Sequence, residues 1–193
     1  MVTTFKTLIY FTIHQVFLAK SGAEMDEAFV ERVSPFVRHF YGQPHLIVTL
    51  GGDNNFNASN DVMVEVKCVL DHHKNIVEQV ESTPKYVSHF LGLNNKEFIK
   101  MFCRCNILIL GLLPRPKSNH IYKQYLREVN KGLLELSQRY GSCFFAPIHK
   151  KFVVDGSVKP GLHIHDGVHL NDAGGKIAAD FIFSRIVALP KIQ

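Results

Sequence analysis

Apolar residues along this chain gather in short runs, and longer stretches with helical spacing separate these runs. Runs that are apolar and rich in β-branched residues are typical of strands inside a sheet. The predicted strands are Leu8–Phe11, His45–Leu50, Asn106–Gly111 and Cys143–Ala146. Pro44 and Gly51 bound the second run, which we expect to be covered on both faces.

The stretches between these runs carry apolar residues at the spacing of one helix face, which predicts amphipathic helices. Such helices are predicted over 25–40, 62–80 and 121–140, and from Asn171 or Asp172 to Leu189. Pro35 forces a kink or a break in the first of them. The second begins with alternating apolar residues over 62–68, which also suits a strand, although its length favours a helix.

Two of these helices have predicted ends. Gly141 is the predicted C-cap of the helix over 121–140, and Asn171 or Asp172 is the predicted N-cap of the last helix. The predicted apolar side of that last helix consists of Ile177, Ala178, Phe181, Ile182, Ile186 and Leu189.

Strands that alternate with helices imply parallel pairing through right-handed crossovers. The 193 residues fit one domain, so we expect a single α/β unit with a three-layer α/β/α sandwich. In such sheets the functional residues collect on loops after the carboxyl ends of the strands. Gly51–Asn55, Leu112–Pro116 and the segment around Asp166 occupy such places.

The composition is that of an ordinary globular protein, with 46% hydrophobic and 20% charged residues, which excludes a disordered chain. The net charge of +5 permits weak attraction to nucleic acid or an anionic membrane, but the Lys and Arg residues are scattered, which favours a solvated basic surface. None of the four cysteines forms a CxxC pair, so buried thiols in a reducing compartment are expected.

The N-terminal stretch has two interpretations. Thr7–Ala19 is largely apolar, follows Lys6 and runs into small residues at Ser21-Gly22-Ala23, as a secretory signal does. Polar residues interrupt it, and it is too short to span a bilayer. We favour a buried strand and a cytoplasmic location, with secretion as the alternative.

Asp166-Gly167-Val168-His169 is the first candidate for chemistry. An acid three residues before a histidine, in a loop that leads into a helix, is able to hydrogen-bond the imidazole and leave its other nitrogen free as a general base. The alternative is a surface turn that Asp166 caps, with a solvated His169. A metal site is a further alternative, because His163, His165, Asp166 and His169 lie within seven residues.

Two further stretches have residues suited to binding an oxyanion. Asn54 follows a predicted strand and two glycines, and its side-chain NH2 is a donor of the kind that stabilises a tetrahedral intermediate. Gly22 offers a backbone N–H between a predicted strand and helix. The structural alternatives are an Asx-rich turn for Asn54 and, for the segment at Gly22, a capping box made by Ser21 and Glu24.

These blocks together resemble the SGNH-type (GDSL-like) hydrolases. The resemblance rests, in order, on Lys20-Ser21-Gly22-Ala23, Leu50-Gly51-Gly52-Asp53-Asn54-Asn55, Gly111-Leu112-Leu113-Pro114-Arg115-Pro116, and Asp166-Gly167-Val168-His169-Leu170-Asn171 with Gly174 or Gly175 following. It spans about residues 20 to 185, and the last block is the most specific.

The resemblance implies a flavodoxin-like parallel sheet of about five strands and hydrolysis of a small acyl ester through a serine acyl-enzyme. It implies His169 as the base, Asp166 as the orienting acid, and Gly22 and Asn54 as the oxyanion hole, with no metal and no cofactor. Asn55 stands where the family usually has an acid.

The family's first block, a Gly-Asp-Ser turn after the first strand, does not occur here: Thr12-Ile13-His14-Gln15 follows Phe11. Ser21 lies inside the second block rather than at a strand-to-helix turn. Thr12 follows the strand and could attack, but a threonine is unusual there, so the nucleophile stays unassigned. We expect either an esterase-like domain whose first 19 residues replace or truncate that block, or an inactive pseudo-hydrolase. The second would act as a binding module, such as a transposon-derived domain associated with nucleic acid.

Overall fold

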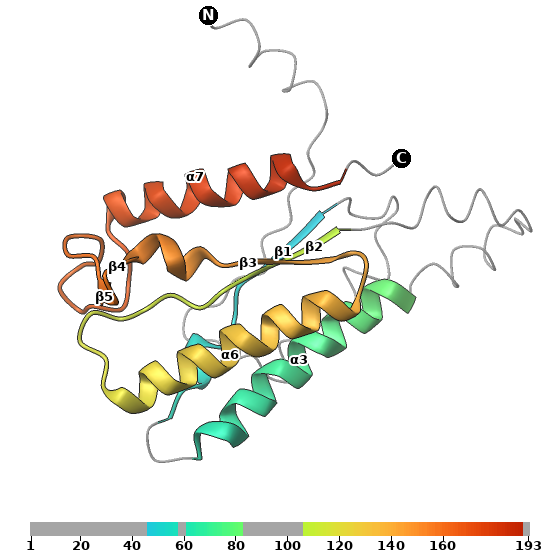
Figure 1. The fold of residues 1–193 in the computed structure, drawn as a ribbon, viewed down its shortest axis with the longest axis horizontal. Helices are drawn as coiled ribbons and strands as arrows, with labels where there is room; N and C mark the ends of the chain where they lie inside the picture. Colours follow the sequence, from blue (N-terminus) through green and yellow to red (C-terminus); the bar gives the residue numbers. More distant parts are fainter. Residues whose placement is uncertain (1–45, 58–60, 83–105, 191–193) are drawn as a thin grey trace, which may run out of the picture.

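The computed structural model describes residues 46–57, 61–82 and 106–190 of the chain (Figure 1). The elements are β1 (Leu46–Thr49), the 3-10 helix η1 (Asp53–Asn55), α3 (Val62–Ser82), β2 (Asn106–Leu110), α6 (His120–Arg139), β3 (Cys143–Ala146), the 3-10 helix η2 (Ile148–Phe152), β4 (Val153–Val154), β5 (Ser157–Val158) and α7 (Asp172–Ala188). The strand predicted at Leu8–Phe11 and the helix predicted over 25–40 lie outside the described residues.

The three longer strands form one parallel sheet in the order β1-β2-β3. Ile47 of β1 pairs with Ile107 of β2, and Ile109 of β2 pairs with Phe145 of β3. β2 therefore lies between the other two strands, and all three run in the same direction. The predicted α/β class and the parallel pairing are confirmed for these strands. The described part of the chain contributes three strands to this sheet.

Helices cover both faces of β2. Ile107 and Ile109 pack in one buried cluster with α3 and α6, while Leu108 and Leu110 pack in a second cluster with α7. Figure 1 shows α3 and α6 side by side on one side of the sheet and α7 on the other. Because successive side chains of a strand point to opposite faces, a strand covered in this way is apolar throughout.

The expectation that the first described strand is covered on both faces is wrong for one of its residues. Val48 of β1 pairs with Leu108, which places it on the face that α7 covers, yet Val48 is 43% exposed. Leu108 is buried beneath α7 and Leu46 of β1 packs at the margin of the same cluster, so the cover by α7 does not extend along β1 as far as Val48. The β-branched residues predicted the strand, but they gave no information on how much of its surface α7 covers.

The helices correct two predictions. Residues 62–68 belong to α3, so the strand alternative is wrong; the alternation there includes Val64, which is exposed on the first turns.

Gly141 is not the C-cap of α6. The cap is Tyr140, which has an extended backbone (φ −126°, ψ 124°) and whose carbonyl accepts from the Cys143 amide at 3.1 Å. The chain enters β3 so soon that a left-handed glycine is not used.

The segment between β3 and Asp166 contains a short antiparallel hairpin. β4 pairs with β5, and Asp155 (φ 47°) and Gly156 (φ 76°) form the two-residue connection. Positive φ at both central residues is the requirement of a type I′ turn, whose twist matches that of paired strands.

None of the described helices is both long and apolar enough to cross a membrane.

Two neighbouring leucines of α6 test which face of that helix is buried. Leu133 is fully buried against α3 and the sheet, whereas Leu134 is 43% exposed. We expect Leu133→Ala to lower the free energy of unfolding by about 2–5 kcal/mol, because it removes buried methyl groups and leaves a cavity. Leu134→Ala should change it by less than about 0.5 kcal/mol. Urea unfolding followed by circular dichroism measures both.

A buried histidine on α3 makes the stability depend on pH. Burial lowers the pKa of His73 from 6.5 to about 4, although the bond from its Nδ1 to the Val69 carbonyl at 3.0 Å acts against this. His73 therefore becomes protonated below about pH 6.5 in the unfolded chain, but only below about pH 4 in the folded chain. Stability should fall as the pH drops through this window, by about 2 kcal/mol at pH 5.

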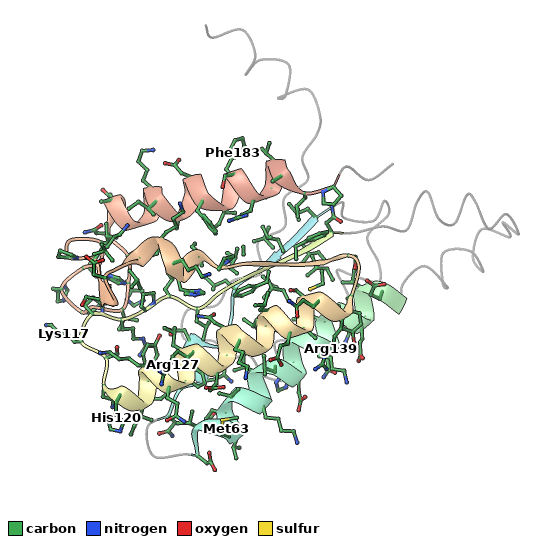
Figure 2. All side chains as sticks on the ribbon, viewed as in Figure 1. Met63, Lys117, His120, Arg127, Arg139 and Phe183 are labelled. Carbon is green, nitrogen blue, oxygen red and sulfur yellow. The ribbon has the colours of Figure 1, made fainter. Side chains whose placement is uncertain are left out.

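The variant His73→Leu should lose this part of the pH dependence in urea unfolding at pH 7.5 and pH 5. His120→Gln is the matched control, since His120 lies exposed at the start of α6 (Figure 2). An identical pH slope in His73→Leu and the unaltered protein would contradict the assignment.

Candidate active site

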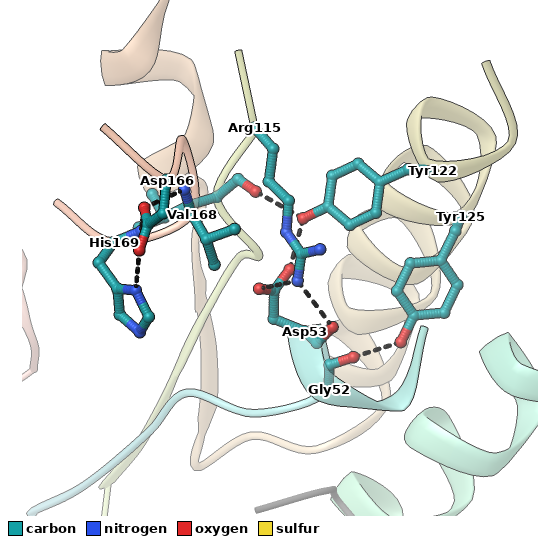
Figure 3. A network of polar contacts seen from close by, with 9 residues as sticks. Gly52, Asp53, Arg115, Tyr122, Tyr125, Asp166, Val168 and His169 are labelled. Atoms are coloured by element: carbon teal, nitrogen blue, oxygen red, sulfur yellow. Dashed lines mark hydrogen bonds and ion pairs between the residues drawn. The ribbon is translucent and has the colours of Figure 1, made fainter. Parts of the chain in front are cut away.

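Three loops meet at the carboxyl edge of the sheet (Figure 3). They follow β1 (residues 51–57), follow β2 (111–119) and precede α7 (161–171). Arg115 of the second loop forms an ion pair with Asp53 of the first at 2.5 Å. A Cβ placed on Gly167 of the third would lie 4.0 Å from Pro116 Cδ. The loop after β2 is therefore bonded to the first loop and lies close to the third.

The Asp166 carboxylate makes three hydrogen bonds within its own turn. Oδ1 accepts from the backbone amides of Val168 at 2.7 Å and His169 at 3.0 Å, and Oδ2 accepts from His169 Nδ1 at 2.6 Å. Gly167 occupies the left-handed region (φ 69°), which lets the chain fold back on itself. The same carboxylate thus shapes the turn and orients the ring, so the two sequence interpretations of Asp166 describe compatible features.

This arrangement keeps Asp166 ionised and selects the tautomer of a neutral His169 ring. The hydrogen bond from the His169 ring, followed by those from the two amides, holds the pKa of Asp166 well below its usual range. An ionised carboxylate on Nδ1 places the ring proton there, which leaves the Nε2 lone pair as the acceptor. The His169 side chain is 74% exposed, so Nε2 is accessible to a ligand or to solvent.

Asn171 anchors this loop to α7. Its side-chain oxygen accepts from the Gly174 amide at 3.0 Å as the N-cap, and its NH2 donates to the Gly161 carbonyl at 2.8 Å. Its backbone amide also donates to the Leu162 carbonyl at 3.1 Å. Of the two predicted caps, Asn171 is the one observed. The six predicted apolar residues of α7 all pack in the cluster beneath it.

The turn after β1 depends on one of its two glycines. Gly52 has φ 109°, and a Cβ there would lie 2.7 Å from a methyl carbon of Val69. Its carbonyl accepts from the Asn55 amide at 3.2 Å and from the Tyr125 hydroxyl. The chain therefore makes one tight turn of 3-10 helix, pressed against α3 and tied to α6.

Asp53 joins this turn to the loop after β2. Arg115 donates to the Asp53 carboxylate and, at 3.2 Å, to its backbone carbonyl, while the Tyr122 hydroxyl bonds the other carboxylate oxygen. The guanidinium carbon also lies 4.5 Å from the centre of the Tyr122 ring. Burial, then the charge of Asp53, raises the pKa of Tyr122 above its ordinary value, so this hydroxyl remains a donor.

The start of the loop after β2 is held by Asn130 of α6. The buried Asn130 side chain accepts from the Leu112 amide at 2.7 Å and donates to the Leu112 carbonyl at 3.3 Å. A side-chain amide thus supplies the backbone partners that a neighbouring strand would otherwise give. Sequence reasoning missed Asn130, Asp53 and Arg115. An arginine between two prolines, directly after the apolar residues Leu112 and Leu113, was the one available signal.

Of the two predicted oxyanion donors, the structure describes only the backbone of Asn54. Asn54 lies in η1, within the turn that Asp53 ties down, but its side chain is outside what the structure describes. Gly22, Ser21 and Thr12 also lie outside the described residues. The roles predicted for Asn54 and Gly22, and the identity of a nucleophile, therefore stay predictions.

The histidines of the metal alternative lie in different surroundings. His163 is partly buried with its ring 6.1 Å from that of Phe152, and burial lowers its pKa, with the Pro114 carbonyl acting in the opposite direction. His165 is exposed. Within residues 46–57, 61–82 and 106–190, no three His, Cys, Asp or Glu side chains gather as a metal site would require.

No protein-family model and no curated protein sequence matches this chain. A solved structure described as "a putative platelet activating factor from Streptococcus pneumonia" is similar over 85% of this chain and 68% of that chain, with a TM-score of 0.56 and 19% identity. At this level of identity the similarity concerns the fold alone.

Two adjacent glycines test the packing that anchors the His169 loop. A Cβ on Gly174 would lie 2.2 Å from the Leu162 carbonyl oxygen, whereas a Cβ on Gly175 meets nothing within 4 Å. We expect Gly174→Ala to destabilise the fold by about 1–3 kcal/mol through overpacking. Gly175→Ala should stabilise it by about 0.5–1 kcal/mol, because alanine is the better helix former. Thermal unfolding distinguishes the opposite signs.

Proposed function

We propose that this chain is an SGNH-type hydrolase domain that hydrolyses a small acyl ester, with Asp166 and His169 as its orienting acid and general base. The observation that carries the proposal is the 2.6 Å bond from His169 Nδ1 to Asp166, with an exposed imidazole at the carboxyl edge of a parallel sheet. The similarity of fold to a solved structure supports it.

In the proposed reaction, His169 Nε2 removes the proton from a hydroxyl that attacks the ester carbonyl. Asp166 keeps the ring oriented and stabilises the imidazolium that forms. The oxyanion of the tetrahedral intermediate accepts from the Gly22 amide and from Asn54. His169 then returns the proton to the leaving alcohol. If the attacking hydroxyl is a side chain, this step leaves an acyl-enzyme; His169 then takes a proton from water, which attacks the acyl carbonyl, and gives it to the side-chain oxygen as the acid leaves. If the attacking hydroxyl belongs to water, the first attack releases the acid directly, and both routes add one water to each ester.

The same proposal places the three described strands in a flavodoxin-like sheet of about five strands. Leu8–Phe11 would supply another strand, and Gly22 would follow it toward the site. The turn that carries Asn54 and the loop that carries His169 already flank one shared segment, Leu112–Pro116. That shared neighbour is what makes a common site for the two residues geometrically reasonable.

The sequence departure at the nucleophile favours a second candidate. Thr12-Ile13-His14-Gln15 replaces the Gly-Asp-Ser turn, and a hydrolase of this kind without its nucleophile loses nearly all turnover. The second candidate is therefore a binding module that keeps the fold, with nucleic acid as its partner. It predicts binding of single-stranded nucleic acid that weakens steeply with salt.

Cleavage of p-nitrophenyl acetate by purified variants tests the enzymatic proposal. We expect His169→Ala to abolish the protein-dependent rate and Asp166→Asn to lower it about 10²–10⁴-fold, because the ring loses its orienting carboxylate. His165→Ala is the matched control: any exposed imidazole cleaves this ester slowly, and His165 lies exposed in the same loop. Equal rates in the His169 and His165 variants would remove the proposal.

A fluorophosphonate probe identifies the attacking hydroxyl. Labelling that depends on His169 assigns the attack to a side chain, and mass spectrometry of the labelled peptide locates it. Turnover that depends on His169 without labelling assigns the attack to water. If neither labelling nor turnover depends on His169, the binding module is the better account.

A further inference from the structure

We propose that Arg115 is a positioning residue, which holds the Gly52–Asn55 turn in register with the Asp166–His169 loop. The inference rests on the proposed function for its catalytic consequence, but the contacts that carry it are independent of that function. Figure 3 shows Arg115 between the two groups, with Asp166, Val168 and His169 on one side and Gly52, Asp53 and Tyr125 on the other.

Arg115 fixes Asp53 at two points. One guanidinium nitrogen donates both to the carboxylate at 2.5 Å and to the backbone carbonyl of Asp53 at 3.2 Å. A contact to the side chain alone would leave the backbone free to rotate, whereas this pair of contacts restrains the main chain of the turn. The next residue along that main chain is Asn54.

The environment strengthens this tie. The Arg115 and Asp53 side chains are only 24% and 34% exposed, so water screens their attraction less than it would on an open surface. Burial acts to lower the pKa of Arg115, but the hydrogen bond and charge of Asp53 raise it overall, which keeps the guanidinium charged. The guanidinium also lies over the Tyr122 ring, 4.5 Å from its centre, which adds a favourable cation–π contact.

The tie also connects the two halves of the site. Arg115 belongs to the loop after β2, and the neighbouring Pro116 lies close to Gly167 in the Asp166–His169 turn. The Tyr122 hydroxyl lies within hydrogen-bond distance of both Asp53 and the Leu113 carbonyl, at 3.0 Å from the latter. A shift of Arg115 would therefore move the Asn54 turn relative to His169, with little effect on either buried cluster.

Because the buried clusters should be little affected, a positioning role of Arg115 is distinguishable from a general structural role. The sheet and the clusters on its two faces contain neither Arg115 nor Asp53. Loss of the ion pair should therefore loosen one turn and leave the fold in place. The backbone amide of Asn55, which donates to the Gly52 carbonyl at 3.2 Å, reports the integrity of that turn directly.

Amide hydrogen exchange measured by NMR on the full chain tests the inference. We expect Arg115→Met to accelerate exchange at Asn55 by about tenfold or more, because a charge-assisted hydrogen bond is lost. The amide of Ile107 in β2 should be unaffected, and Arg115→Lys should restore protection in part, since it keeps the charge without the planar fork. Arg127→Met on the exposed side of α6 is the matched control (Figure 2).

A double variant keeps the test decisive if Arg115→Met folds poorly. Removing both charges with Asp53→Asn and Arg115→Met avoids a lone half-buried carboxylate, so the fold should recover while Asn55 still exchanges fast. In ester cleavage, Arg115→Met should lower kcat several-fold and leave KM almost unchanged.

The outcomes are distinguishable from those for the proposed function. Unchanged exchange at Asn55 in both the single and double variants overturns the positioning role, whatever the enzyme does. Accelerated exchange with unaltered kcat in a protein whose turnover depends on His169 overturns its catalytic consequence. If no turnover depends on His169, the proposed function fails and the exchange data alone decide whether Arg115 holds the turn.

Discussion

The burial of β2 on both faces, with a parallel partner on each edge, is the constraint on which the rest of this structure depends. Its four apolar residues Ile107–Leu110 belong alternately to two buried clusters, and each described α-helix packs into one of them. Parallel strands point their carboxyl ends to the same edge, so the loops after β1 and β2 must leave there together. The candidate site is a consequence of that shared exit.

At this edge, polar side chains replace backbone pairing as the means of holding the chain. Asn130 binds both backbone groups of Leu112, Tyr125 binds the Gly52 carbonyl, and Asp166 binds two amides of its own turn. Each of these side chains bonds a backbone group that lies outside the sheet and has no partner strand. Loops tied in this way keep a defined geometry, which any chemistry between them requires.

The sequence predicted the elements well wherever burial was uniform along a face. β3 spans the predicted residues, and the apolar side of α7 contains the six residues predicted for it. It failed where a local choice depended on what followed: Tyr140 ends α6 in an extended conformation because β3 begins three residues later. The β4–β5 hairpin was not predicted, although an Asp-Gly pair such as Asp155-Gly156 favours a two-residue hairpin turn because both residues tolerate positive φ.

The sequence by itself determined the periodicity of strands and helices and the local turn at Asp166, because those follow from contacts between residues close along the chain. Only the tertiary structure decided that Arg115 meets Asp53, that Tyr122 reaches both, and that Gly174 rather than Gly175 touches Leu162. These contacts join residues that are far apart in sequence, or depend on which side of a helix turn faces the sheet. Side-chain type alone contains neither piece of information.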